Sequence, residues 1–406
     1  MISTSKSARV EDGAALARGS GEGPTPAPSL RVVAAEWGRI GVTGFGGPPA
    51  HIALLRRLCV DERGWLSPEE FEDAVAACNL LPGPASTQLA IYCAWRLRRR
   101  AGALVGGAAF ILPGLALILG LAALFLAGSP PRWVVGLGAG AGAAVAAVAA
   151  RVGASLVPAS WRRARAASRV RWLAYLVAGG VAAATLGPWL VLVLLGCGAL
   201  EVLCAGARRG STSSFAPLPL LVAALAATGG LASLVWVAFK VGALSFGGGF
   251  VIVPLMQADA VHHYHWMTSA QFLNAVALGQ VTPGPVVLTV AVVGYAAAGV
   301  GGGLLATAVA FAPSFLFILA GGSRLAWVRG DARARSFLAG AGPCAIGAII
   351  GSAVPLALAL SEAWQVAVLA GAAVALLVAR RGVVTTLLAA GVVGMVVVLA
   401  GGPLPH

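Results

Sequence analysis

The sequence predicts an all-α polytopic membrane protein built from two repeats of inverted topology, with broken or re-entrant helices at Gly-Gly and Pro-Gly-Pro motifs. Three observations predict this fold class. The 406-residue chain is 59% hydrophobic and 10% charged, with a mean hydropathy of +0.89. Apolar runs that reach the ~20 residues of a spanning helix occur repeatedly. The chain also aligns with itself at a spacing of 201 residues, and its arginines are distributed unequally between the two copies.

Composition excludes several classes of protein. A soluble enzyme would carry about 25% charged residues. The net charge of +14 comes from arginine clusters between apolar segments rather than from a basic domain, so we expect no nucleic-acid partner. The six cysteines lack CxxC spacing and are expected to be buried apolar residues. HExxH, GxSxG and Walker motifs are absent, so we expect neither an enzyme nor a cofactor.

The repeat keeps residue types in register that chance similarity among Ala, Val and Leu would not keep. Gly44–Gln88 aligns with Ser245–Thr289 without a gap. The identical pairs include Phe45/Phe246, Gly46/Gly247, Gly47/Gly248, Trp65/Trp266, Phe71/Phe272 and the Pro-Gly-Pro triplets at 82–84 and 283–285. The chain therefore divides into a disordered cytoplasmic tail at 1–35, an N-terminal copy at 36–210, a linking transmembrane segment at 211–236 and a C-terminal copy at 237–406.

Arginine placement predicts that the two copies are inverted, because Lys and Arg in short loops stay cytoplasmic. The N-terminal copy has arginine clusters at 56–63 and 96–100, whereas 241–323 contains no Lys or Arg. We therefore expect the N-terminal copy's loops inside and the matching loops at 257–265 and 297–303 outside, as in many secondary transporters. This topology places the N-terminus in the cytoplasm and the C-terminus outside.

Counting crossings from the arginine cluster at 96–100 gives the predicted spans in order. They lie near 103–127, 133–150, 172–187, 188–206, 217–236, 304–322, 337–358, 362–379 and 382–400. Segments 40–58 and 241–257 begin and end on one side, so we expect them to be re-entrant. The Pro-Gly-Pro triplet at 82–84 interrupts the segment 67–95, which we expect to form two half-helices, and a new half-helix is also expected to start after the triplet at 283–285. Non-helical backbone at membrane depth occurs only inside protein or beside a water-filled cavity, so the breaks mark a transport pathway.

The breaks also supply the candidate substrate-binding groups. The N-terminus of a half-helix carries about half a positive charge and unpaired N–H groups, so it can hold an oxyanion without a basic side chain. The candidates are Gly46, Gly47, Asn79, Gly83, Pro84, Ser86, Thr87 and Gln88 in the N-terminal copy, and Gly247, Gly248, Gln280, Thr282, Gly284 and Thr289 in the C-terminal copy. The alternative is that these hydroxyls and amides only satisfy the backbone that the breaks expose.

Two further polar residues lie in or directly before the segments predicted to be re-entrant. Lys240 stands in an apolar stretch where a buried cation costs about 2.5–3.5 kcal/mol, and it either attracts an anion or snorkels to an interface. His51 either binds an anion or carries a proton, or it is a hydrogen-bonded structural residue. The acids that open the helix at 67–72 are expected to face water. The histidines at 262–265 lack the spacing of a metal site, so no metal is expected.

Several motifs occur together at these breaks. They are Gly44-Phe45-Gly46-Gly47-Pro48 with His51, Trp65-Leu66-Ser67, Leu80-Leu81-Pro82-Gly83-Pro84, Phe246-Gly247-Gly248-Gly249 and Gln280-Val281-Thr282-Pro283-Gly284-Pro285. Together they resemble the long, two-domain members of the chromate transporter family, although Phe250 stands where a His is expected in many C-terminal copies. The resemblance covers about residues 36–320.

The resemblance implies a multi-pass protein of the bacterial inner membrane that exports chromate from the cytoplasm, with sulfate as a structural mimic. Membrane potential or a proton gradient would drive this export, and the sequence does not separate uniport from proton-coupled or sulfate exchange. A sulfate transporter or a broader anion transporter or channel is the second interpretation, and a membrane scaffold is the third. The expected partners are the oxyanion and the lipid bilayer, and a homodimer is left open.

Overall fold

The computed structural model describes residues 27–79, 81, 83–128, 130–164, 168–186, 189–207, 230–245, 252–322 and 332–404. These residues form helices, and no strand occurs among them, which confirms the all-α class. Within the described ranges, four helices are long and apolar enough to cross a membrane: Ala85–Phe125, Arg132–Arg163, Val286–Gly321 and Ala332–Leu358. The candidates Gly247 and Gly248 lie outside the described residues, as do most of the predicted tail and of the linking segment.

The N-terminal copy is a series of helices that starts earlier than the sequence predicts. Its elements are α1 (Leu30–Thr43), α2 (Pro48–Arg56), the π-helix η1 (Arg57–Glu62), α3 (Pro68–Cys78), α4 (Ala85–Phe125), α5 (Arg132–Arg163), α6 (Arg169–Thr185) and α7 (Leu190–Ala207). The range 1–35 given to the tail is therefore too long. Ser29 caps α1 by accepting a hydrogen bond from the backbone N–H of Val32. Trp37 lies on the buried face of this helix.

The C-terminal copy has corresponding elements. They are α9 (Leu231–Leu244), α10 (Ile252–Gln257), the π-helix η5 (Ala258–His263), α11 (Ser269–Val281), the short 3₁₀ helix η6 (Val286–Leu288), α12 (Thr289–Gly321), α14 (Ala332–Gly351), α15 (Ala353–Leu358), α16 (Ala363–Ala373), the π-helix η8 (Val374–Val378) and α17 (Val383–Leu399). Thr268 and Gln271 form a capping box at the start of α11, and Ser67 caps α3 at the equivalent place.

The structure repeats at the same spacing of 201 residues as the sequence. The π-helices η1 and η5 begin and end at equivalent positions. Gly83 and Gly284 both have positive φ angles, of 119° and 100°, and Gly64 and His265 form a second such pair. Gly83 and Pro84 of the first Pro-Gly-Pro triplet, and all of the second at 283–285, lie between helices, as predicted. That the copies are inverted remains a prediction from the arginines.

The long helices α4 and α12 each contain a sharp reversal. In α4 the backbone leaves the helical conformation at Arg98 and Arg99, and Gly299 marks the corresponding place in α12. A Cβ atom at Gly106 would collide with the Cβ of Ala94, whereas a straight helix would hold these residues roughly 18 Å apart. The half of α4 before the bend is roughly 20 Å long, which is too short to cross a ~30 Å hydrocarbon layer alone.

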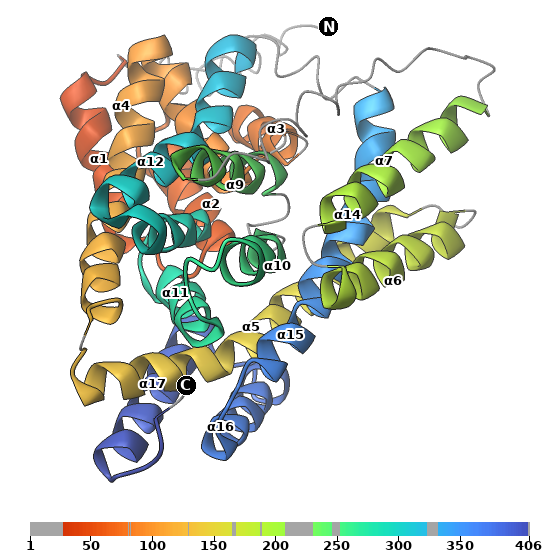
Figure 1. Cartoon of the computed structure of the whole chain (residues 1–406). Coiled ribbons are helices and arrows are strands. Elements are labelled where there is room, and N and C mark those ends of the chain that lie inside the picture. Colours follow the sequence, from red (N-terminus) through yellow and green to blue (C-terminus); the bar gives the residue numbers. More distant parts are fainter. Residues whose placement is uncertain are drawn as a thin grey trace, which may run out of the picture.

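The two copies exchange one helix each, α5 and α14. α5 of the N-terminal copy packs against α16 and α17 of the C-terminal copy, while α14 of the C-terminal copy packs against α6 and α7 (Figure 1). Glycine allows the close approach, because a Cβ atom at Gly140 would collide with the carbonyl of Ala390, and one at Gly347 with the carbonyl of Leu176. Each copy therefore packs one of its helices against helices of the other copy.

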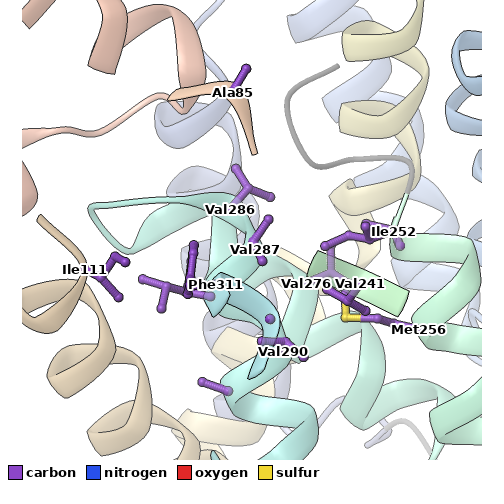
Figure 2. Close-up of a cluster of buried hydrophobic side chains, with 14 of the residues drawn as sticks. Ala85, Ile111, Val241, Ile252, Met256, Val276, Val286, Val287, Val290 and Phe311 are labelled. Atoms are coloured by element: carbon purple, nitrogen blue, oxygen red, sulfur yellow. The ribbon is translucent and has the colours of Figure 1, made fainter. Parts of the chain in front are cut away.

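A buried apolar cluster joins the two copies around the breaks. Its side chains come from α4, α9, α10, α11, η6 and α12 (Figure 2). Val286 and Val287, directly after the second Pro-Gly-Pro triplet, lie in this cluster together with Phe311 of α12. The breaks are consequently surrounded by low-dielectric material, in which a hydrogen bond to an ion is stronger than in water.

Candidate functional site

The breaks of the two copies meet in space. The backbone N–H of Gly284, in the second Pro-Gly-Pro triplet, donates a hydrogen bond to the carbonyl of Gly44, which ends α1 (3.1 Å). Gly47, at the start of α2, lies next to Val286. The first break of the N-terminal copy therefore contacts the Pro-Gly-Pro break of the C-terminal copy, although some 240 residues separate them.

His51 holds three segments together at this contact. Its Nε2 lies 2.9 Å from the carbonyl oxygen of Gly44, and its Nδ1 lies 3.4 Å from the hydroxyl oxygen of Ser86 at the start of α4. A carbonyl only accepts, so Nε2 carries the proton and Nδ1 of the neutral ring accepts from Ser86. The ring is fully buried, edge-on to Phe110. These contacts match the hydrogen-bonded structural role.

The Pro-Gly-Pro break of the N-terminal copy packs against two helices of the C-terminal copy at Gly83. This glycine has a φ of 119°, a conformation that side chains rarely adopt. A Cβ atom here would lie 2.6 Å from the side-chain nitrogen of Gln88, 3.2 Å from the hydroxyl of Ser314 and 3.4 Å from the carbonyl of Gly242. Gly242 belongs to α9 and Ser314 to α12, so the N-terminal copy's Pro-Gly-Pro break lies against the C-terminal copy.

Four buried polar groups near these breaks have no hydrogen-bond partner within the described part of the chain. They are the hydroxyls of Thr87, Ser245 and Ser314 and the side-chain nitrogen of Gln280. Buried polar groups are normally paired, so each such group calls for a ligand or a water molecule. All four can donate a hydrogen bond, which is what an oxyanion requires.

Ser245 and Ser314 were missed by the sequence prediction. A signal existed for both of them. Ser245 occupies the position equivalent to Gly44, and Ser314 is a polar residue beside Pro313 in an otherwise apolar helix.

Several other predicted residues have different surroundings. The hydroxyl of Thr282 donates to the carbonyl of Leu278, and that of Thr289 donates to the carbonyl of Val286. For these two threonines the structure matches the alternative, in which a side chain satisfies nearby backbone. Asn79 is exposed at the end of α3. Gly46 and Pro84 shape the backbone of the breaks: Gly46 has a φ of 99°, and Pro84 directly precedes α4.

Lys240 does not snorkel. Its Nζ lies 2.5 Å from the Oδ2 of Asp259 on η5, both side chains are buried, and the ammonium lies over the ring of Trp236. The sequence prediction gave 257–265 to a loop, and this is wrong for Asp259: η5 continues α10 as a helix, and the carboxylate is buried inside the protein. The pair neutralises the cation, so no unpaired charge remains at this point.

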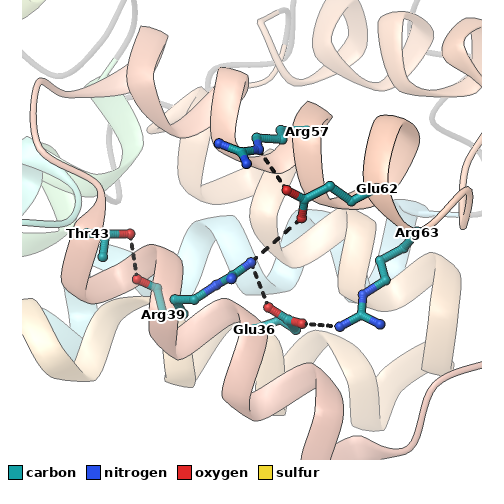
Figure 3. A network of polar contacts seen from close by, with 6 residues as sticks. All are labelled: Glu36, Arg39, Thr43, Arg57, Glu62 and Arg63. Carbon is teal, nitrogen blue, oxygen red and sulfur yellow. Dashed lines mark hydrogen bonds and ion pairs between the residues drawn. The ribbon is translucent and has the colours of Figure 1, made fainter.

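An exposed ion-pair network occupies the equivalent place in the N-terminal copy. Glu36 on α1 pairs with Arg39 (3.0 Å) and with Arg63 (2.6 Å), and Glu62 pairs with Arg57 and, at 3.9 Å, with Arg39 (Figure 3). Arg39 stands at the position equivalent to Lys240. In each copy, therefore, a cation on the first helix pairs with an acid on the π-helix.

Two of the acids near the start of α3 form ion pairs. Glu70 and Glu72 on α3 pair with Arg96 and Arg56. Within the described ranges no group of three His, Cys, Asp or Glu side chains could hold a metal ion.

Comparison with known sequences identifies the family. The sequence model of a family described as chromate transporter matches this chain twice, at residues 32–202 and 232–395. The chain belongs to the chromate transporter family. A chromate transport protein of Cupriavidus metallidurans is 32% identical over 94% of this chain and 95% of its own length. A probable chromate transport protein of Synechococcus elongatus (31%; 82% and 85%) and a chromate transport protein of Pseudomonas aeruginosa (31%; 84% and 84%) are also similar. No solved structure matches.

Proposed function

We propose that this chromate transporter family member is a secondary transporter that exports chromate from the cytoplasm across the inner membrane. The observation that carries the proposal is the set of unpartnered donors beside breaks contributed by both copies. The names of the relatives support chromate as the substrate. Sulfate has the same tetrahedral dianionic form, so transport of sulfate or a broader range of anions is the second candidate.

The proposed site binds the oxyanion by backbone and hydroxyl donors. α4 begins directly after Pro84 without a side-chain cap, so its first N–H groups are available to a ligand. Thr87 and Ser314 add hydroxyl donors, and Gly83 lets the backbone approach the ligand. In the C-terminal copy, Gly284 has the corresponding positive φ and Gln280 provides a side-chain N–H donor. Neutral donors bind a dianion less tightly than a positively charged side chain would. Weaker binding favours release of the substrate.

The membrane potential favours this direction. Moving a dianion out of a negative-inside cell releases roughly 4.6 kcal/mol per 100 mV, at about 2.3 kcal/mol per charge. Export therefore needs no nucleotide. Either the potential or a proton gradient provides the driving force in the proposal.

Everted membrane vesicles should accumulate chromate when the protein is present, because their interior corresponds to the outside of the cell. We expect uptake of radiolabelled chromate to rise with the imposed potential, inside positive, and sulfate in excess to compete. Nitrate, a planar monoanion, should not. Varying the potential and the pH gradient separately identifies the driving force. Uptake of sulfate but not chromate would favour the second candidate, and uptake of neither would contradict transport.

The inverted topology that we propose is testable at one matched pair of positions. Asp61 and His262 are equivalent at the spacing of 201 residues, both are exposed, and each lies in the π-helix of its copy. In Asp61→Cys and His262→Cys, an impermeant thiol reagent applied to intact cells should label only the second. It should label the first in everted vesicles. Labelling of both from one side would contradict the inversion, and the parent protein gives the background from native cysteines.

A further inference from the structure

A groove runs along the hairpin of α16, η8 and α17, away from the breaks. Its volume is about 620 Å³, which lies within the range of ligand pockets. It is lined by Trp364, Ala367, Val368, Gly371, Ala372, Ala375, Arg381, Thr385, Thr386, Ala389, Ala390, Val393 and Val397. Almost all of this lining is apolar, and Gly371 leaves it open, because a Cβ atom there would meet no other atom within 4 Å.

The groove opens on a surface that faces lipid. Val366, Val374, Val392 and Val396, on the same helices, are all at least half exposed. Exposed apolar side chains at this density are expected where a protein contacts hydrocarbon. Trp364 lies at one end of the groove and donates its indole N–H to the carbonyl of Pro403, a placement typical of the membrane interface.

The opposite end of the groove carries two arginines. Arg381 lines the groove and Arg380 precedes it, and both are exposed. Neither forms an ion pair with any acid in the described part of the chain. Residues 363–399 contain no Asp or Glu at all. Unpaired arginines beside an apolar groove at a helix end are suited to the phosphate of a lipid head group.

We infer that this groove binds an anionic phospholipid. The phosphate contacts Arg381 and Arg380, and one acyl chain lies along the small side chains toward Trp364. A second copy of the protein fits the groove less well. Copies related by an axis normal to the membrane would bring equivalent ends of the hairpin together, so the arginines of both chains would meet without a compensating acid. A lipid provides the missing negative charge.

The test is lipid retention measured by native mass spectrometry. The full-length protein is reconstituted in equal amounts of phosphatidylglycerol and phosphatidylcholine with the same acyl chains, then released in mild detergent. We expect the wild type to retain phosphatidylglycerol in preference to phosphatidylcholine. Arg381→Gln removes a charge-assisted contact and should weaken retention about tenfold. Gly371→Leu fills the groove and should reduce retention of both lipids there.

Gly120→Leu is the matched control, because Gly120 is also exposed on a helix and also has open space at its Cβ position. It should retain lipid as the wild type does. Equal phosphatidylglycerol retention in Arg381→Gln or in Gly371→Leu would overturn the inference. So would a Gly371→Leu protein that loses a dimer, measured by light scattering, while keeping its lipid, because the occupant would then be a second copy.

Discussion

Asp259→Asn should deplete the protein from the membrane. The substitution leaves the ammonium of Lys240 buried beside a neutral amide, and removing one partner of a buried ion pair costs about 3–5 kcal/mol. That is a large part of the stability of most proteins. We expect both membrane abundance and the melting temperature of the detergent-purified protein to fall.

The double variant Lys240→Met/Asp259→Leu separates stability from substrate binding. Replacing both charges by apolar residues of similar size is often neutral or stabilising, so abundance should recover. If chromate transport per molecule also recovers, Lys240 is a structural residue; if it does not, Lys240 takes part in transport. Glu62→Gln removes one partner of the exposed pair with Arg57 and should change stability by no more than about 1 kcal/mol. An equally stable Asp259→Asn protein would contradict the buried pair.

Gly83→Ala should abolish chromate transport. The positive φ costs a residue with a side chain about 1–3 kcal/mol, and the added methyl group would lie 2.6 Å from the side-chain nitrogen of Gln88. The methyl group also points toward Ser314, where we propose that the oxyanion binds. The measurement is vesicle uptake of chromate divided by the amount of inserted protein. We expect a smaller loss for Gly284→Ala, because the nearest atom to its added methyl group lies at 3.4 Å.

Gly299→Ala is the control for backbone strain. Gly299 has a φ of 63° at the bend of α12, and a Cβ atom there would meet no atom within 4 Å. The Gly299→Ala variant should therefore show the energetic cost of a positive φ angle alone, without any effect at the breaks. Normal transport by Gly83→Ala, or an equal loss in Gly299→Ala, would place the binding site elsewhere.

Much of the fold could be predicted from local sequence signals. Pro-Gly-Pro removes donors and disfavours helix in the residue before it, so the breaks before α4 and η6 were predictable. Likewise, Ser67 followed by Pro68 indicated where α3 begins. The exchange of α5 and α14 between copies could not be predicted. It depends on glycine-rich helix faces that meet across more than 140 residues, and the sequence of such a face does not indicate which helix it packs against.

The candidate site was predicted in part. The residues that follow the breaks, such as Ser86 and Thr87, are buried there, because a chain that re-enters a helix inside protein must bury its first turn. The partner of Lys240 was missed because residues 257–265 were predicted to be a loop, whereas 258–263 form a π-helix. The continuation of α10 into η5 turns Asp259 inward at a place where polar neighbours indicated a loop.

The exchange of helices between the copies also bears on the order of assembly during synthesis. When the ribosome has completed α7, the glycine face of α5 still lacks α17, and α6 and α7 still lack α14. These helix faces contact lipid or the insertion machinery until the second copy has been synthesised. A chain cut between the copies would therefore give two fragments that each expose a docking face and that recover the native arrangement only by finding each other. Each half therefore needs the other to complete its packing. A substitution that weakens the contact of α5 with α17 would first reduce the amount of correctly assembled protein, before it affects transport by the assembled protein.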